Sequence, residues 1–371
     1  MQDAGGSWWA GRTRWIVAGV VALVVAVGAV ALASGGGDDG GGDGADTVVG
    51  TAVAPAQTGR GARTTGGDGD DPQPGLPEPG RGRDGDDETG DGPALPVRKG
   101  AASGVEVGIG EHGTAMFDDP RFRALGIRRA RLVVAYDATK VRFEREIVDS
   151  WLAGAQRAGV EPFITFGHSR VRPQRLPSVA EFRARFREFH RRWPQVRVFA
   201  AWNEANHASQ PTSGAPERAA DFFDVVRAEC SGCTVVAGDL LDQAGMERYL
   251  ATYRRSLDST PAVWGLHNYA DTNRFRRTGV QTLLRAVEGP IWLTETGGLY
   301  SFGRSFPPSA RRQARALAYT FRIARSSPRI ERVYLYNWTG APRGARFDAG
   351  LISASGTPRP AYRTLKTALG R

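Results

Sequence analysis

Two glutamates stand directly after apolar runs of the chain, where a buried strand would end. Glu204 follows the residues AAWN, and Glu295 follows IWLT. A carboxylate in such a place is costly unless it is paired, hydrated or used in a reaction. Two of them in one pocket can cleave a glycosidic bond, because one donates a proton to the leaving oxygen while the other attacks or stabilises the anomeric carbon. The simpler alternative is that each glutamate pairs with one of the many arginines.

The elements that would position these glutamates form a regular series. From residue 103 onward, short runs rich in Val, Ile, Leu and Phe recur at spacings that suit a strand plus a helix and are too long for hairpins. The predicted strands cover residues 105–110, 130–136, 161–167, 196–203, 234–238, 263–268, 291–294 and 332–337. Amphipathic segments that predict helices cover residues 141–158, 179–192, 216–229, 246–257, 282–287, 310–325 and 360–369.

Eight strand-helix units within residues 101–371 predict a (β/α)8 barrel, or TIM barrel. A doubly wound sheet remains the alternative, because a count of strands does not establish closure. In a barrel of this kind the active site lies at the carboxyl ends of the strands. Glu204 and Glu295, on the fourth and seventh predicted strands, should therefore face the same mouth.

The residues around both glutamates resemble glycoside hydrolase clan A, the retaining (β/α)8-barrel glycosidases, with similarity to its families 5 and 39. In that clan the acid/base follows an Asn on strand four, and the nucleophile ends strand seven. Asn203-Glu204 is similar to the first pattern, and Glu295 in LTETGG is similar to the second.

Three further segments extend this resemblance. His267 and Tyr269 in LHNY look like the clan's His-x-Tyr, whose tyrosine usually contacts the nucleophile. Trp338, after the eighth strand, looks like the aromatic floor under the sugar at the cleavage point. Residues 126–132, GIRRARL, are similar to the clan's entry to strand two and would place Arg131 near the nucleophile.

The resemblance implies a role for each of these groups. Glu204 would be the general acid and then the general base, which requires a raised pKa. Glu295 would stay ionised near Arg131 and Tyr269 and form a glycosyl-enzyme intermediate. Asn203 would hydrogen-bond the sugar 2-hydroxyl, and retention requires carboxyl groups about 5 to 5.5 Å apart.

Four of the five histidines fall at predicted strand ends: His112, His168, His207 and His267. Metal-dependent barrel hydrolases usually begin with a His-x-His pair on strand one, which this chain lacks. We therefore expect no metal, and we count His168, His207 and His267 as candidate sugar contacts. A GxGxxG pattern at residues 108–113 is a weak dinucleotide signal, because Pro120 follows soon after and no clear helix opens at Gly113. We expect no organic cofactor.

The N-terminal third of the chain predicts a membrane tether. Residues 15–33 carry no charge and as a helix would span roughly 28 Å, which matches a bilayer core. Arginines precede this run and aspartates follow it, so the positive-inside rule exports the rest of the chain. We assign residues 1–34 to a cytoplasmic stub and signal-anchor, 35–100 to a disordered linker rich in Gly, Asp and Pro, and 101–371 to the barrel. A cleaved signal peptide is the alternative, and it too exports the barrel.

Charge and cysteine content bound the possible partners. Residues 101–371 hold 41 Arg or Lys against 25 Asp or Glu, a net charge of +16. No basic run is interleaved with stacking aromatics, so we expect no nucleic-acid binding. Cys230 and Cys233 lie in a CSGC between a predicted helix and a predicted strand. Outside the cell they would form a small local disulfide or remain idle thiols.

These observations predict a retaining glycosidase that cleaves O-glycosidic bonds of a cell-surface or extracellular glycan. The barrel would be a monomer outside the cytoplasm, held at the plasma membrane by a single-pass helix or secreted if that segment is cleaved. Its partners would be an oligo- or polysaccharide and, through the N-terminal helix, the membrane. The alternative is a catalytically inactive, membrane-tethered carbohydrate-binding barrel.

Overall fold

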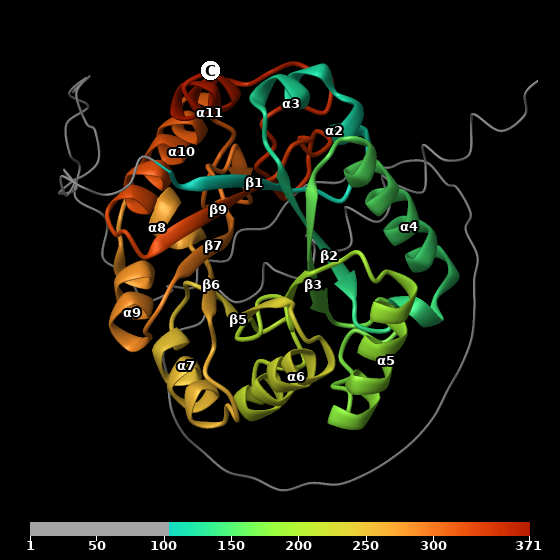
Figure 1. The fold of residues 1–371 in the computed structure, drawn as a ribbon. Helices are drawn as coiled ribbons and strands as arrows, with labels where there is room; N and C mark the ends of the chain where they lie inside the picture. The colour runs from blue at the N-terminus through green and yellow to red at the C-terminus, as the bar shows by residue number, and fades with distance from the viewer. Residues whose placement is uncertain (1–103) are drawn as a thin grey trace, which may run out of the picture. The chain divides into compact units, whose positions relative to one another are not determined.

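The computed structural model describes residues 104–371, which form a closed barrel of eight parallel strands (Figure 1). Every predicted strand is present, so the barrel is confirmed and the doubly wound sheet is excluded. Going round the barrel, the strands are β1 (Glu106–Gly110), β2 (Arg129–Ala135), β3 (Glu161–Gly167), β4 (Val198–Ala200), β5 (Thr234–Leu241), β6 (Val263–His267), β7 (Ile291–Thr296) and β9 (Ile330–Tyr336). The barrel closes where β9 pairs with β1.

The helices surround the strands, as Figure 1 shows. Their bounds are α4 (Arg142–Arg157), α5 (Val179–Arg192), α6 (Pro216–Glu229), α7 (Met246–Arg255), α9 (Thr278–Ala286), α10 (Ala310–Arg325) and α11 (Pro360–Ala368). The Ser178 side chain accepts a hydrogen bond from the Glu181 backbone N–H at 3.1 Å and caps the start of α5. Helix α9 begins four residues before its predicted start.

Several short elements were not predicted from the sequence. Helices α2 (Ala115–Asp118) and α3 (Pro120–Leu125) follow β1, and α8 (Tyr269–Asn273) follows β6. A two-stranded antiparallel sheet pairs β8 (Ser301–Phe302) with β10 (Phe347–Asp348). A short 3₁₀ helix also spans Ala138–Lys140. All of these segments are too short to show a hydrophobic period of their own.

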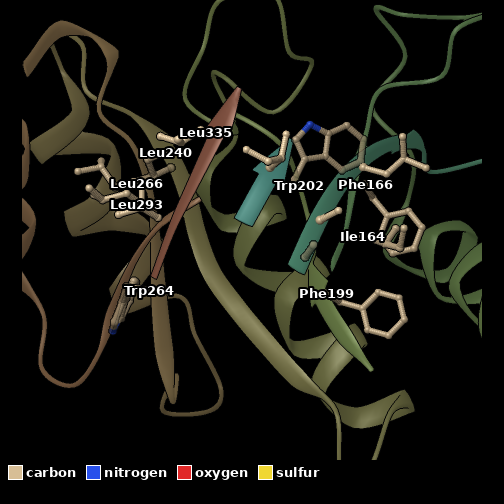
Figure 2. Packing of buried hydrophobic residues seen from close by; sticks show 14 of the residues in the cluster. Ile164, Phe166, Phe199, Trp202, Leu240, Trp264, Leu266, Leu293 and Leu335 are labelled. Carbon is tan, nitrogen blue, oxygen red and sulfur yellow. The ribbon is translucent and has the colours of Figure 1, made fainter. Parts of the chain in front are cut away.

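Side chains alternate between the barrel interior and the helix layer. On β3, Phe163 belongs to an inner cluster, whereas Ile164 packs in the larger cluster beneath the helices. The Phe163 ring contacts Trp292 of β7 and Tyr334 of β9, with ring centres 6.0 and 5.2 Å apart. Contacts between strands that are not neighbours show that the inner cluster fills the barrel. Figure 2 shows part of the outer layer, including Leu240, Leu266, Leu293 and Leu335 from β5, β6, β7 and β9.

The first two glycines of the GxGxxG pattern have a packing role. A Cβ at Gly108 would lie 2.5 Å from the Tyr334 ring, and one at Gly110 would lie 3.3 Å from Tyr336. Because glycine has no Cβ, β1 leaves room for two aromatic rings of β9 inside the barrel.

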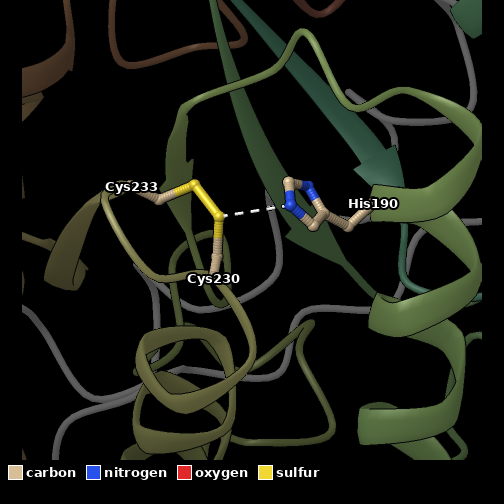
Figure 3. The surroundings of a disulfide bond; sticks show 3 residues. All are labelled: His190, Cys230 and Cys233. Atoms are coloured by element: carbon tan, nitrogen blue, oxygen red, sulfur yellow. Dashed lines mark hydrogen bonds between the residues drawn. A yellow bond between two sulfur atoms is a disulfide. The ribbon is translucent and has the colours of Figure 1, made fainter.

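The predicted membrane segment 15–33 and the linker 35–100 lie outside the described residues. Within residues 104–371, no helix has the length and apolar character that a bilayer crossing requires. Cys230 and Cys233 are joined by a disulfide, and Figure 3 shows it beside His190, whose Nε2 lies 3.5 Å from the Cys230 sulfur.

Candidate active site

A pocket of about 410 Å³ contains both predicted catalytic carboxylates. It opens among the residues that follow the strands, which is the barrel end where a (β/α)8 enzyme carries its active site. Its lining residues are His112, Val133, Asn203, Glu204, His207, Leu241, Asp242, Gln243, Ala244, Tyr269, Ala270, Arg274, Arg276, Glu295, Leu299, Phe302, Phe306, Tyr336 and Phe347.

Glu204 and Glu295 face each other across this pocket. One carboxylate oxygen of Glu204 lies within 4.8 Å of one of Glu295, and both side chains keep partial access to solvent, 19% and 14% exposed. A separation of this size is close to the roughly 5 to 5.5 Å of retaining glycosidases and shorter than the roughly 6.5 to 9.5 Å that an inverting enzyme leaves for its water.

Glu295 is held by one cation and one hydroxyl. Arg131 Nη1 donates to Glu295 Oε2 at 2.6 Å, and the Tyr269 hydroxyl donates to Oε1 at 3.1 Å. The structure therefore brings Arg131 and Tyr269 to Glu295, as the sequence resemblance implied. Arg131 is 1% exposed and does not line the pocket, so it lies beneath Glu295.

The same arginine joins Glu295 to a second carboxylate, Asp239 of β5. Arg131 Nη2 donates to Asp239 Oδ2 at 2.9 Å and to Asn203 Oδ1 at 2.7 Å. Attraction to Arg131 and His267 outweighs the burial of Asp239 and lowers its pKa. Sequence analysis missed Asp239. The available signal was an acidic residue inside the apolar run VVAGDLL, where an unpaired carboxylate would be costly.

His267 connects both carboxylates from below. Its Nδ1 lies 3.2 Å from Glu204 Oε1 and 3.9 Å from Glu295 Oε2, and its Nε2 lies 3.2 Å from Asp239 Oδ1. Burial by itself lowers the pKa of His267, but the charges of Asp239 and Glu295 and the hydrogen bonds to Asp239 and Glu204 raise it to about 10. His267 is 0% exposed and does not line the pocket, so its ring lies beneath the two glutamates.

The environment of Glu204 differs from the predicted one. Burial raises the pKa of its carboxyl, but the hydrogen bond and charge of His267, with smaller contributions from His207 and Arg131, outweigh burial and lower the pKa. Without a bound sugar the predicted upward shift is therefore absent. Glu204 also has a φ of 45°, in the left-handed region that residues other than glycine seldom adopt. Its carbonyl accepts the His207 backbone N–H at 2.7 Å, which helps to hold this turn.

Trp338 does not form the floor of the pocket. Its ring is 2% exposed and packs edge-on against Phe122 and Tyr362, while its Nε1 donates to Asp119 Oδ2 at 3.2 Å. Strand β9 ends at Tyr336, and the Ile352 backbone N–H donates to the Trp338 carbonyl, so the chain has left the barrel by this point. The aromatic residue of this strand that lines the pocket is Tyr336.

The remaining candidates divide into two groups. Asn203 and His207 line the pocket, and His207 Nδ1 lies 2.7 Å from the Ser209 hydroxyl. His168 is not part of the pocket lining. Its Nδ1 lies 3.2 Å from Gln210 Oε1, which also accepts a hydrogen bond from the Trp202 indole at 3.1 Å. His168 therefore contacts the loop after β4.

Glu204, His267 and Glu295 together have the donor types of a metal site, with ligand atoms within 4.8 Å of one another. The surrounding charges oppose that reading. Arg131 Nη1 already donates to Glu295 Oε2 at 2.6 Å, so a permanent cation lies against one of the three candidate ligands. The cluster fits proton transfer and nucleophilic attack at a polarised carbon better than metal binding.

Comparison with known families identifies residues 177–364 as a match to the glycosyl hydrolase catalytic core, which covers about half of the chain. The match contains Glu204 and Glu295. No curated protein matches the chain.

Solved structures with the same fold are also glycoside hydrolases. A family 5 (subfamily 18) enzyme from Streptomyces cattleya superposes with a TM-score of 0.55 at 16% identity, over 72% of this chain and 80% of that one. A family 39 β-xylosidase from Caulobacter crescentus gives a TM-score of 0.52 at 17% identity, over 74% and 72%. A third structure is a family 39 glycoside hydrolase from Bacteroides cellulosilyticus, with 16% identity and a TM-score of 0.49. The match covers 72% of this chain but only 63% of the length of that protein. The family match confirms the predicted glycosidase, and the Streptomyces cattleya and Caulobacter crescentus structures share the fold of this barrel.

Proposed function

This chain belongs to the glycosyl hydrolase catalytic core family, so its barrel is a glycosidase domain, and we propose that it cleaves O-glycosidic bonds with retention through Glu204 and Glu295. The observation that carries this proposal is the approach of the two carboxylates to within 4.8 Å in one open pocket. Inversion would require room for a water between them.

The reaction proceeds in two displacements. In the first, Glu295 attacks the anomeric carbon while Glu204 donates its proton to the glycosidic oxygen, so the leaving sugar departs with a hydroxyl group and Glu295 carries the remaining sugar as an ester. In the second, Glu204 takes a proton from water, whose oxygen attacks the same carbon and releases Glu295. Glu204 ends protonated and Glu295 ends free, as both stood at the start of the first displacement.

The network beneath the pocket orients these groups. Arg131 and Tyr269 fix both oxygens of Glu295. Because Asn203 Oδ1 already accepts from Arg131, its amide N–H groups are the ones available to a sugar hydroxyl. We assign Asn203 to the 2-hydroxyl of the sugar, where a hydrogen bond strengthens in the transition state.

The proton of the first step has a source in this network. In the free pocket His267 holds a proton on the ring whose Nδ1 lies 3.2 Å from Glu204. A sugar that enters displaces water and raises the pKa of Glu204, because desolvation disfavours the carboxylate. The proton then moves from the imidazolium to Glu204, which donates it to the glycosidic oxygen.

Substitution separates this enzyme from an inactive sugar-binding barrel. Wild-type chain, Glu204→Gln and Glu295→Gln are assayed against a panel of aryl glycosides and polysaccharides. The proposal requires that both variants lose at least roughly a thousandfold in kcat while they still bind oligosaccharide. Binding without turnover in the wild-type chain would support the inactive barrel instead.

We further propose that the barrel works outside the cytoplasm, held by residues 15–33 or released after their cleavage. The uncharged run and its flanking charges support export, and a disulfide between Cys230 and Cys233 fits an oxidising compartment. Protease added to intact cells should digest the barrel of the full chain. Digestion only after the membrane is opened would contradict this location.

A further inference from the structure

Two arginines line the pocket in the segment that joins α8 to α9. Phe275, between Arg274 and Arg276, has a φ of 52° and packs its ring edge-on against Tyr319 of α10, with ring centres 5.5 Å apart. The ring anchors the segment to the helix layer, while both flanking arginines are exposed and line the pocket. The segment therefore presents two guanidinium groups to the contents of the pocket.

These two charges are weakly compensated. Arg274 places its guanidinium 5.8 Å from the ring centre of Phe306, and within residues 104–371 it has no ion pair. Arg276 Nε lies 3.8 Å from Asp271 Oδ1, and its side chain is 49% exposed. The oxygens of Asp271 already accept the backbone N–H groups of Gly279 and Val280 at 3.1 and 2.8 Å. Both arginines thus keep donors for a ligand.

The other carboxyl group beside them, Asp242, does not neutralise them either. It is 5% exposed, and its oxygens accept the backbone N–H groups of Ala270 and Asp271 at 2.9 and 2.6 Å. Burial and repulsion by Asp271 raise the pKa of Asp242 to about 8, which reduces its negative charge near neutral pH. This side of the pocket is therefore cationic.

Aromatic rings connect this cationic side with the catalytic carboxylates. Phe347 lies edge-on to Tyr269 at 5.9 Å and close to Tyr336 at 6.1 Å, and it contacts Phe302 at 6.0 Å. Phe306, beneath Arg274, also lines the pocket. A sugar can stack its C–H face on such rings. A planar carboxylate fits the paired donors of a guanidinium.

We propose that Arg274 and Arg276 bind the carboxylate of a uronic acid unit, so that the substrate is an acidic glycan. This inference rests on the proposed glycosidase function and specifies its substrate class. The excess positive charge of the barrel, +16 over residues 101–371, agrees with it, because a cationic surface raises the local concentration of an anionic chain.

The test compares matched pairs of ligands on the full chain. Oligosaccharides that contain uronic acids, their carboxyl-reduced neutral counterparts and sulfated neutral oligosaccharides are titrated by calorimetry against Glu295→Gln, which prevents turnover. At least one acidic oligosaccharide should bind roughly tenfold or more tightly than its reduced counterpart, the size expected of one or two charge-assisted hydrogen bonds. The double substitution Arg274→Gln with Arg276→Gln should abolish that preference.

Arg285→Gln is the matched control, since Arg285 is an exposed arginine of α9 outside the pocket and contacts Thr282. It should leave the preference unchanged. The inference is overturned if no acidic oligosaccharide is preferred over its reduced form, if the preference survives the double substitution, or if only sulfated ligands depend on the two arginines. Hydrolysis of neutral glycans that requires Glu295 would, in those cases, leave the proposed function standing. Hydrolysis that persists in Glu295→Gln would instead remove the proposed function.

Discussion

Arg131 Nη1 lies 2.6 Å from Glu295 Oε2, and the arginine that makes this contact is 1% exposed. The same guanidinium binds Asp239, which is equally buried. A buried cation between two carboxylates holds the pocket floor in one arrangement, because removal of any member leaves an uncompensated charge.

Substitution of this arginine is therefore expected to affect both folding and chemistry. Arg131→Met should lower the free energy of unfolding by roughly 3 to 5 kcal/mol, since Asp239 loses its cation inside the barrel. Urea denaturation at neutral pH measures the change. The double substitution Arg131→Met with Asp239→Leu removes both charges and should recover part of the lost stability. A single variant as stable as the wild-type chain would refute this account of the floor.

Asp239 is expected to act on the reaction through His267. Asp239→Asn should lower the pKa of His267, because the charge of Asp239 contributes most to raising it. Imidazole NMR signals report that pKa directly, and the alkaline limb of the kcat profile should move to lower pH. Asp221→Asn, a partly exposed aspartate of α6, is the control. If the pH profile of Asp239→Asn is unchanged, Asp239 contributes to the structure but does not affect the reaction through His267.

The free energy of unfolding should decrease at alkaline pH because of His267 and at acid pH because of Asp239. The pKa of His267 rises from 6.5 to about 10, so its contribution is complete below pH 6.5 and is lost as pH rises through about 10. The pKa of Asp239 is lowered from 3.8, so its contribution is complete above that value and is lost as pH falls below it. Denaturation midpoints from pH 3 to 11 should therefore fall at both ends. In His267→Gln the alkaline decline should become shallower, and an identical decline would contradict the assigned charge.

Substitution of Tyr336 should mainly lower kcat/KM, whereas substitution of Trp338 should mainly lower the stability of the fold. Tyr336→Leu removes a ring from the pocket and should lower kcat/KM roughly two- to tenfold with a small change in midpoint, since stacking contributes roughly 0.5 to 1.5 kcal/mol beyond buried area. Trp338→Leu leaves a cavity against Phe122 and should cost roughly 2 to 4 kcal/mol of stability. Its kcat/KM per folded molecule should stay close to that of the wild-type chain. The reverse pattern would restore Trp338 as the sugar platform.

The sequence was sufficient for the barrel because each strand is short and rich in apolar residues, and the strands recur at spacings that leave room for a helix between them. The sequence did not predict side-chain positions that depend on the register between strands or on where a strand ends. Strand β5 was expected to end at Gly238, but it continues to Leu241 with a shift of register that brings Asp239, at a φ of 53°, onto Arg131. Trp338 was placed in the pocket on motif position alone, although β9 ends at Tyr336. No local sequence pattern predicts the register shift in β5 or the position of Trp338 outside the pocket.

The sequence predicted which residues form the candidate site, but it did not predict the direction of the Glu204 pKa shift. Glu204, Glu295, Asn203 and Tyr269 lie in one pocket because strand ends converge in a barrel. The pKa of Glu204 was expected to be raised, because the acid/base role requires it. The structure places His267 against it, and the charge of that imidazole depends on Asp239, which lies 28 positions away in the chain.

Labelling of the nucleophile tests the central claim most directly. The full chain is incubated with a panel of activated 2-deoxy-2-fluoro glycosides, which slow release of the glycosyl-enzyme more than its formation, and its peptides are mapped by mass spectrometry. We predict one sugar adduct, on the peptide that contains Glu295, with none formed in Glu295→Gln. An adduct on another residue, or release of a product of inverted configuration from a cleaved substrate, would contradict the account.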